Sequence, residues 1–439
     1  MSNTISEVLE FVRENDVQFV RLAFSDLLGQ QKNISIMPDQ LPEAFQSGVS
    51  FDAHAIRGFR EVTRSDLLLF PDPGTLAVLP WRPGPGRVAR FFCDIRTPDG
   101  SPFAQDGRQL LRQAEARCQK LGYHAMVGAE CEFYLFRTDE DGQPTTATLD
   151  RGGYLDIAPL DKGEDIRREI CLSLQEMNLR PEASHHEQGP GQNEIDFQFS
   201  DPLSCADNLL TFKSVVKAVA ARHGLFASFM PKPIPDAPGS GLHVNLSLSQ
   251  NGFNIFKAPT QGQPGAAAHF MAGVLARVPE MTAFLNPLVN SYERFGAFEA
   301  PKYLTWSHHN RSQLIRIPAA TGEKERMELR SPDPALNPYL AFALILSAGM
   351  EGIREERPLP PAADLDLYRL DRATADTLTR LPGSLEEAMD LARRSSFAAG
   401  VLGEELVAKY LALKEEEAAA AAAGGDRAGF YARRYFPFI

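Results

Sequence analysis

Two glutamates stand two residues apart in a segment that otherwise has the pattern of a buried strand. Glu130 and Glu132 alternate with Cys131 and Phe133 within Gly128 to Phe136. Because side chains alternate along a strand, both carboxylates lie on one face and the apolar residues on the other. Adjacent carboxylates repel unless a cation neutralises them or one is protonated. The pair therefore indicates a hard metal ion, with an acidic, solvent-facing strand as an equally good alternative.

Further possible metal ligands follow in three later motifs. Glu187 and Glu194 flank a Gly-Pro-Gly turn between strand-like residues, so a hairpin can bring both carboxylates to one rim; the alternative is a polar loop with incidental acids. His243 alternates with leucine and valine, although a lone histidine of this kind is more often structural than a ligand. Glu328 and Arg330 are again two apart and share a strand face.

A set of arginines accompanies these acids. Arg311 lies just before the β-rich run Leu314 to Ile317 and Arg316 within it; both are typical of anion clamps, although arginines also serve as solubilising surface residues. Carboxylates with one imidazole favour Mg²⁺ or Mn²⁺ over zinc, and divalent ions with arginines suit phosphoryl transfer. The chain has neither G-x-x-x-x-G-K-[ST] nor G-x-G-x-x-G, which excludes P-loop and kinase-like machinery.

Composition excludes several classes of protein. The chain has 439 residues, of which 44% are hydrophobic and 23% charged, and its net charge of -12 argues against nucleic-acid binding. The longest apolar run falls short of the ~20 residues of a membrane span, and the N-terminal segment is charged where a signal peptide would be apolar. Five cysteines without a C-x-x-C pair predict neither a disulfide framework nor a zinc knuckle. We expect a cytoplasmic protein.

The pattern of elements changes near residue 104. Before it, Thr4 to Glu7 form a helix-capping box, and two strands are expected at Val17 to Phe24 and Val88 to Ile95. After it, longer helices and strands alternate; in the first helix Leu110, Ala114, Cys118 and Leu121 share a face, and Gly122 is its left-handed cap. We predict an α+β protein with domains at 1–103 and 104–439 and a mixed or antiparallel sheet, because no strand is continuously apolar.

Taken together, these motifs resemble the glutamine synthetase family in its shorter bacterial type I form. The resemblance spans essentially the whole chain. It rests on Phe51-Asp52, Gly128 to Phe136, His185 to Phe197, Met230 to Pro233, Gly239 to His243, Asn290 to Arg294, Glu299 to Pro301, Asn310 to Pro318 and Glu328 to Leu340.

The resemblance implies a small β-grasp domain over 1–103 and a larger catalytic domain with an antiparallel sheet over 104–439. It also implies a homododecamer of two hexameric rings, with each active site built between neighbouring subunits. The expected reaction phosphorylates the γ-carboxylate of glutamate with ATP, and ammonia then displaces phosphate from γ-glutamyl phosphate. Two or more Mg²⁺ or Mn²⁺ ions per site are expected.

The resemblance also assigns roles by position. One metal is expected at Glu132, Glu187 and Glu194, and another at Glu130, His243 and Glu328. Glutamate is expected at Gly239, Arg294 and Arg330. Phosphates are expected at Arg311, Arg316 and Arg326, and the nucleotide also at Glu182, Phe199 and Ser247. Asp52 of a neighbouring subunit is expected to deprotonate ammonium, and Glu299 to lie on a flap that excludes water. Asp52, Glu299 and Arg311 are thus the expected catalytic residues.

The sequence departs from the family pattern around glutamate and ammonium. Ala53-His54-Ala55 replaces Gly-Ser-Ser, Pro238 replaces Asn, His308-His309 replace smaller or basic residues, and the loop before Glu299 is one residue shorter. Two alternatives therefore stay open: a ligase that joins an organic amine to the γ-carboxylate of glutamate, and a non-catalytic nitrogen sensor or scaffold. Tyr368 lies where some relatives are adenylylated, and we interpret it as an ordinary packed tyrosine.

Overall fold

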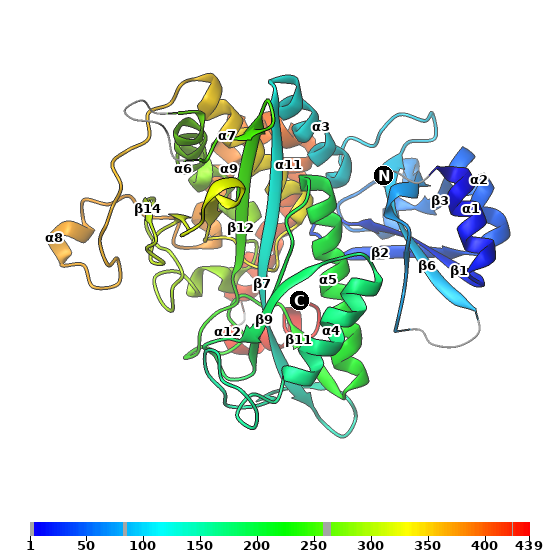
Figure 1. Ribbon diagram of the computed structural model, residues 1–439, viewed down its shortest axis with the longest axis horizontal. Coiled ribbons are helices and arrows are strands. Elements are labelled where there is room, and N and C mark those ends of the chain that lie inside the picture. The colour runs from blue at the N-terminus through cyan, green and yellow to red at the C-terminus, as the bar shows by residue number, and fades with distance from the viewer. Residues whose placement is uncertain (1–3, 82–85, 258–264, 424) are drawn as a thin grey trace.

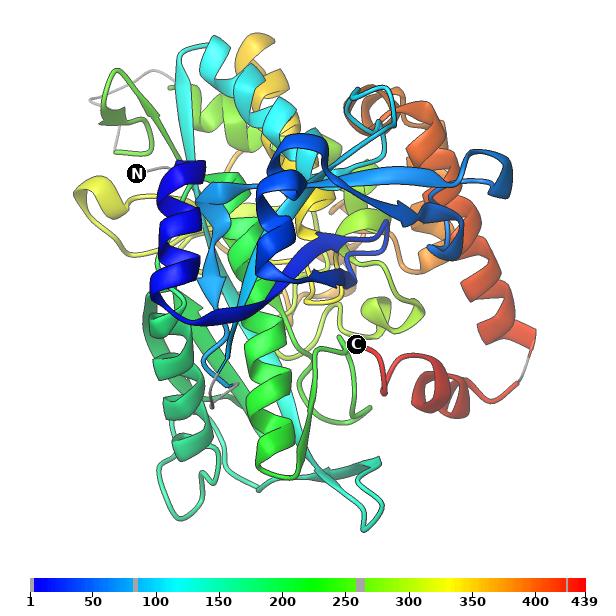
Figure 2. The same ribbon diagram turned by 90° about the vertical axis from the view of Figure 1, so that its right-hand side faces the viewer.

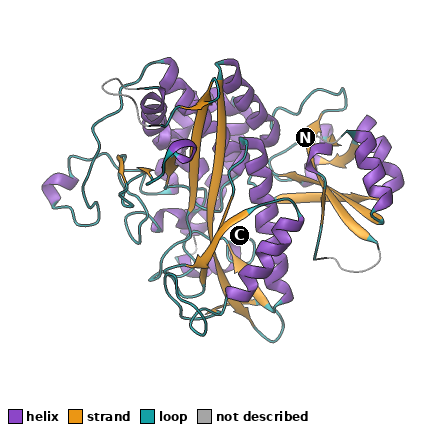
Figure 3. Cartoon of the chain, in the orientation of Figure 1, coloured by secondary structure: helices purple, strands orange, loops and turns teal. Residues whose placement is uncertain are grey.

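The chain forms two separate β-sheets, which lie side by side in Figure 1. The computed structural model describes residues 4–81, 86–257, 265–423 and 425–439. The smaller sheet belongs to the N-terminal segment, coloured blue, and the larger sheet runs through the middle of the remaining chain. Helices cover both sheets (Figure 3). The arrangement confirms the predicted α+β class.

The N-terminal sheet has the strand order β2-β1-β6-β4-β3, and β5 pairs with β6. Strand β1 runs parallel to β6, and the other pairs are antiparallel. Helix α1 begins at the predicted capping box, in which Thr4 and Glu7 satisfy each other's backbone N–H groups. The strands are β1 Val17–Ser25, β2 Gln31–Ile36, β3 Val49–Asp52, β4 Asp66–Pro71, β5 Ala77–Val78 and β6 Arg87–Arg96; the helices are α1 Ile5–Glu14 and α2 Leu41–Ser47.

The larger sheet is organised around one long strand, β7. It pairs with β12 on one side and with β10 on the other, in the order β14-β15-β16-β12-β7-β10-β9. All its pairings are antiparallel except β14 with β15. The strands are β7 Tyr123–Thr138, β8 Pro144–Thr148, β9 Pro181–His186, β10 Gln192–Phe197, β11 Leu225–Ser228, β12 Leu242–Gln250, β13 Phe253–Asn254, β14 Trp306–His308, β15 Ile315–Ile317 and β16 Met327–Leu329.

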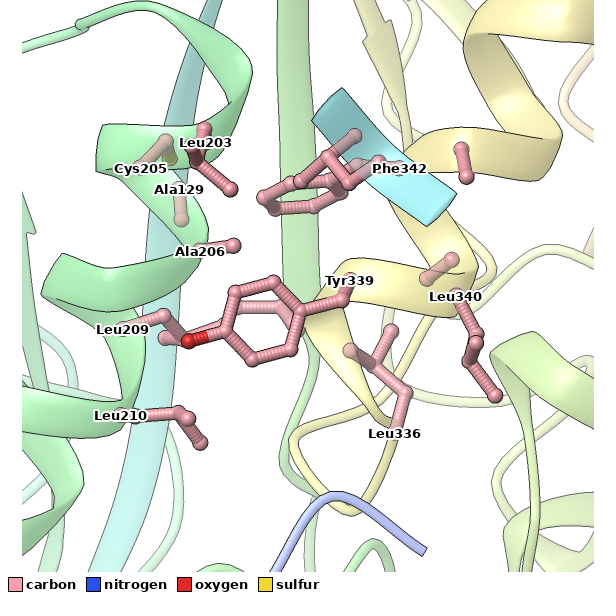
Figure 4. Packing of buried hydrophobic residues seen from close by; sticks show 14 of the residues in the cluster. Ala129, Leu203, Cys205, Ala206, Leu209, Leu210, Leu336, Tyr339, Leu340 and Phe342 are labelled. Carbon is pink, nitrogen blue, oxygen red and sulfur yellow. The ribbon is translucent and has the colours of Figure 1, made fainter. Parts of the chain in front are cut away.

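Helices α3, α5 and α7 pack against one another, and α3 and α5 also pack against β7 of this sheet. Tyr339 of α7 points its ring toward Leu209 of α5 (Figure 4), and its hydroxyl donates to Oδ1 of Asp207 at 2.6 Å. Figure 2 shows the N-terminal segment, in blue, in front of the rest of the chain. The helices are α3 Gly107–Lys120, α4 Glu164–Glu176, α5 Pro202–Arg222, α6 Ala266–Leu285, α7 Pro338–Arg354, α8 Arg372–Ala375, α9 Leu385–Arg394, α10 Ser396–Leu402, α11 Glu404–Ala423 and α12 Arg427–Arg434.

The predicted helix before Gly122 is confirmed as α3, and Gly122 has the expected left-handed φ of 85°. Leu121 is the exception to the predicted apolar face, since it is 52% exposed just beyond the end of the helix. The five cysteines are free thiols. Within the described ranges, no helix is both long enough and apolar enough to cross a membrane.

Candidate active site

Two cavities adjoin on the face of the larger sheet that carries Glu130. The central cavity has a volume of about 540 Å³ and is lined mainly by acids and arginines. The second has a volume of about 440 Å³ and a more apolar lining. Glu130, Asp196 and Arg326 line both cavities, so the acidic cluster stands where the two meet.

Glu130, His243 and Glu328 form a tight cluster on three neighbouring strands. Strand register places His243 of β12 opposite Glu130 of β7, and Asn245 opposite Glu328 of β16. Nδ1 of His243 lies 3.4 Å from Oε2 of Glu130 and 3.6 Å from Oε1 of Glu328. One donor atom from each of the three residues falls within 4.8 Å of the others, which suits a single divalent cation.

Positive charge around the cluster keeps its acids ionised. Burial alone would raise the pKa of Glu130, but the hydrogen bonds from His243 and Asn245 and the charge of Arg326 lower the pKa to about 2. Burial likewise opposes ionisation of Glu328, and the charges of Arg330 and His243 lower its pKa below the usual range. Ionised carboxylate oxygens are the ligands that Mg²⁺ and Mn²⁺ require, so the donors fit such an ion.

Glu132, Glu187 and Glu194 line the central cavity on the other side of His243. Oε1 of Glu132 lies 3.9 Å from Nε2 of His243, and its Oε2 accepts from Gln192 Nε2 at 2.8 Å. Burial and the charge of Glu132 raise the pKa of Glu187 to about 7, and the same causes raise that of Glu194. Such crowding of acids is relieved by a cation. In the described part of the chain these three do not form a cluster as compact as the first.

A buried hydrogen-bond network holds the hairpin that carries Glu187 and Glu194. His186 is fully buried, and its Nε2 lies 2.9 Å from Oδ1 of Asp150. The same carboxylate oxygen accepts from the backbone N–H of Gly191 at 2.9 Å. A loop preceding α4 is thereby tied to the turn between β9 and β10.

The arginines divide into buried and exposed members. Arg294 is 3% exposed and donates from Nη1 to the carbonyl of Ser331 at 2.8 Å. Arg330 and Arg316 each donate at 2.6 Å to a different oxygen of Glu328, which places two predicted substrate-binding cations on one predicted metal ligand. Arg311 is half exposed in the central cavity. Arg326 donates to Asn245 Oδ1 at 2.7 Å.

Gly239 lies where no side chain fits. A Cβ atom there would stand 2.5 Å from the carbonyl oxygen of Pro231 and 3.0 Å from Cγ of Arg294. Pro238 also lines the central cavity, and its carbonyl accepts from the Tyr134 hydroxyl at 2.6 Å. This part of the cavity wall is fixed by backbone contacts rather than by a polar side chain at position 238.

The predicted nucleotide residues Glu182, Phe199 and Ser247 line the second cavity together with Arg326. The Phe199 ring is 45% exposed and is available for stacking against a base. Arg311 and Arg316 line the central cavity instead, on the far side of the shared acids.

The predicted flap residue Glu299 borders the central cavity in a strained backbone conformation. Its φ is 64° and that of Phe298 is 49°, values that non-glycine residues rarely adopt. Oε2 of Glu299 lies 3.8 Å from Arg330 Nη2 and 3.9 Å from Arg311 Nη1.

Asp52 is absent from the lining of the central cavity of its own chain. It lies at the end of β3 in the N-terminal domain and accepts the backbone N–H of His54 at 2.9 Å. Tyr368 is 40% exposed, and its hydroxyl donates to the carbonyl of Ala300 at 3.4 Å.

Sequence reasoning assigned no role to several residues that line the central cavity. Gln192 and Asp196 share the β10 face with Glu194, so the two-residue period of a strand could have revealed them. The same period relates Asn245, which lines the second cavity, to His243 on β12. Tyr154 comes from an irregular loop, and no sequence pattern marks it.

Comparisons with known proteins agree with this geometry. A model of the catalytic domain of glutamine synthetase matches residues 104–428, and one of its β-grasp domain matches residues 16–98. The chain belongs to the glutamine synthetase family. The glutamine synthetase of Methanosarcina mazei is 46% identical over 417 residues, 94% of this chain and 93% of that one. That of Clostridium saccharobutylicum is 45% identical over 94% of each chain.

Solved structures also resemble the whole chain. A structure titled as a GmaS/ADP complex matches with a TM-score of 0.86 and 32% identity, over 96% of this chain and 97% of that one. A ligand-free GmaS structure matches with a TM-score of 0.87 and 31% identity, over 98% of this chain and 99% of the other. Glutamine synthetases use divalent metals and ATP, which fits the carboxylate and imidazole cluster described above.

Proposed function

We propose that the chain is an ATP-dependent glutamate-ammonia ligase that makes glutamine, ADP and phosphate through γ-glutamyl phosphate. The observation that carries this proposal is the position of the acidic cluster between a more apolar cavity of nucleotide size and an arginine-lined cavity. Transfer of a phosphoryl group from ATP to a carboxylate requires cations at such a junction, because charge develops on oxygens of both partners.

We assign two or more Mg²⁺ or Mn²⁺ ions to the cluster. Glu130, His243 and Glu328 would hold one ion, and Glu132, Glu187 and Glu194 another. Bound divalent ions neutralise phosphate oxygens and orient them for in-line transfer. ATP itself would lie in the second cavity against Glu182, Phe199 and Ser247, with Arg326 near its phosphates.

The remaining side chains act on the amino acid and on the transferred phosphate. Arg294 and Arg330 would bind the carboxylates of glutamate, and Gly239, which lines the central cavity, would contact its amino group. Arg311 and Arg316 would neutralise the phosphoryl group during transfer. Glu299 would close over the acyl phosphate and exclude water.

We further propose that the site is completed by a second copy of the chain. Asp52 lies outside the central cavity of its own subunit, so its proposed role as the base that deprotonates ammonium requires a neighbour. A dodecamer of two hexameric rings meets this need, and light scattering on the purified protein measures its mass. We also propose that the chain is divided into domains at 1–103 and 104–439. Its proposed location is the cytoplasm.

The decisive experiment measures phosphate release with ATP, glutamate and a panel of amines. We expect ammonium to support the fastest turnover. An organic amine as the better substrate would favour the γ-glutamyl-amine ligase, for which the replacement Ala53-His54-Ala55 beside Asp52 is the supporting observation. Absence of turnover with every amine, in protein that still binds ATP and Mn²⁺, would favour a sensor or scaffold.

A further inference from the structure

A third cavity, separate from the candidate active site, lies where the N-terminal domain meets the catalytic domain. Its volume is about 160 Å³. The walls come from the β1–β2 turn at 29–31, from helix α5, and from Phe229, Pro334, Ala335 and Ile439. Two lysines of α5, Lys213 and Lys217, line this cavity one helical turn apart and therefore on the same helix face.

Both ammonium groups lie near the same aromatic ring. The Nζ atoms of Lys213 and Lys217 each lie 5.9 Å from the centre of the Phe229 ring. Among the described residues neither lysine takes part in an ion pair. The acid whose charge acts on Lys213, Asp333, is itself buried and accepts hydrogen bonds from the backbone N–H of Ala335 and from Asn286.

The hydrogen-bonding capacity of the two lysines is only partly used. Lys213 donates to the carbonyl of Pro334, and Lys217 donates to the carbonyl of Phe438 at 3.2 Å. An ammonium group has three donors, so hydrogen-bond donors remain for a ligand in the cavity. Ser214 adds a hydroxyl between them, which donates to Gln31 Oε1 at 3.1 Å in this structure.

Electrostatics also favours an anion here. Burial lowers the pKa of Lys213, and burial together with the charge of Lys213 lowers the pKa of Lys217 to about 8. Two like charges one turn apart repel, and the cost of burying them is offset when an anion lies between them. The cavity is smaller than the ~300 Å³ of pockets that take drug-sized molecules, which limits the ligand to a small ion.

We propose that this cavity is a binding site for a small tetrahedral oxyanion of the phosphate type, held by Lys213 and Lys217 at the junction of the two domains. The ligand would contact the Gly29 to Gln31 turn on one side and α5 on the other. Through Lys213 it would reach Pro334, in the loop whose Ser331 carbonyl accepts from Arg294 in the candidate active site. An anion bound in this cavity would therefore influence the position of the loop that accepts the hydrogen bond from Arg294.

Sulfate is the probe for this site, because it has the shape of phosphate and is neither substrate nor product of the proposed reaction. We expect sulfate at ten times its dissociation constant to raise the melting temperature of the full-length protein by about 2 °C over chloride at equal ionic strength. Crystals soaked in selenate are expected to show an anomalous peak beside Lys213 and Lys217.

Variants separate this cavity from the phosphate positions of the active site. Lys217→Met and Lys217→Gln are expected to weaken sulfate binding at least tenfold, because each removes a cation that faces the cavity. Arg222→Met on the same helix and Arg326→Gln in the nucleotide cavity are expected to leave this sulfate binding unchanged. Unchanged sulfate affinity in both folded Lys217 variants, or a selenate peak confined to the active site, would overturn the proposal.

Discussion

Nδ1 of His186 lies 2.6 Å from the carbonyl oxygen of Glu187, while its Nε2 lies 2.9 Å from a carboxylate oxygen of Asp150. Each ring nitrogen thus faces an oxygen acceptor, which suits the protonated ring with two donors. Burial alone would lower the pKa of His186, but the hydrogen bond to Asp150 and the Glu187 carbonyl raise it. Asp150 thereby helps to position the backbone of Glu187, a proposed metal ligand.

Replacement of Asp150 by asparagine is therefore expected to weaken metal binding. The neutral amide would lack the charge that orients His186, so the hairpin carrying Glu187 would be held less firmly. Mutation of a residue that hydrogen-bonds to the ligand-bearing segment typically lowers metal affinity roughly 10- to 100-fold. Calorimetric titration with Mn²⁺ in the absence of nucleotide measures the effect. Asp207→Asn removes an equally buried carboxylate away from the hairpin and serves as the control. A folded Asp150→Asn protein with parental Mn²⁺ affinity would contradict the role.

Loss of a proposed direct ligand is expected to have a larger effect. Glu132→Ala and Glu328→Ala each remove an anion from the cluster, and the second also removes the carboxylate to which Arg316 and Arg330 donate. We expect at least a roughly 100-fold fall in phosphate release for both, in Mg²⁺ and in Mn²⁺. Glu164→Ala, on the exposed side of α4, is the control. If both glutamate variants kept activities within about tenfold of the parent, a difference of about 1.4 kcal/mol in activation free energy, the two-metal assignment would be disproved.

The strand period was enough to predict which acids share a face. Glu130 and Glu132 are on the cavity side of β7, and Cys131 and Phe133 are fully buried on the other side, as the alternation predicted. The same rule applied to β12 placed His243 away from the apolar face. Such local patterns depend only on neighbouring residues, so they can be inferred from a single sequence.

Contacts between distant segments could not be predicted in the same way. Asp150 and His186 are 36 positions apart, and Asp150 belongs to a loop without a periodic pattern. The pairing of Glu328 with Arg316 depends on the register of β15 against β16, which are strands of only three residues each, whereas its pairing with Arg330 follows from their two-residue spacing. Registers of such short strands are set by tertiary packing rather than by local sequence.

Asp52 provides a test of how the amine is activated. Asp52→Ala is expected to lower the rate of glutamine formation at neutral pH by about 100-fold or more while nucleotide affinity stays near the parental value, because the proposed contact is with ammonium alone. The fraction of free ammonia rises about tenfold per pH unit below the pKa of ammonium, so higher pH should restore part of the rate. The measurement is a pH series of glutamine formation with a parallel ADP titration. Two results together would refute the role of Asp52 in deprotonating ammonium. High pH would fail to restore the activity of Asp52→Ala, and the parent protein would turn over an organic amine faster than ammonium.

Pro238 is expected to limit glutamate affinity. Its ring supplies no donor, whereas an asparagine amide beside Gly239 could bond to the substrate while the backbone carbonyl still accepts from Tyr134. One added neutral hydrogen bond is worth about 0.5–1.5 kcal/mol, so Pro238→Asn should lower the KM for glutamate roughly threefold and leave that for ATP nearly unchanged. Titrations of glutamate at saturating ATP measure this, with Pro235→Asn, an exposed neighbour outside the cavity, as the control. An unchanged or raised glutamate KM in Pro238→Asn would mean that the pocket is shaped for a different carboxylate, since the added donor would then find no acceptor on the substrate.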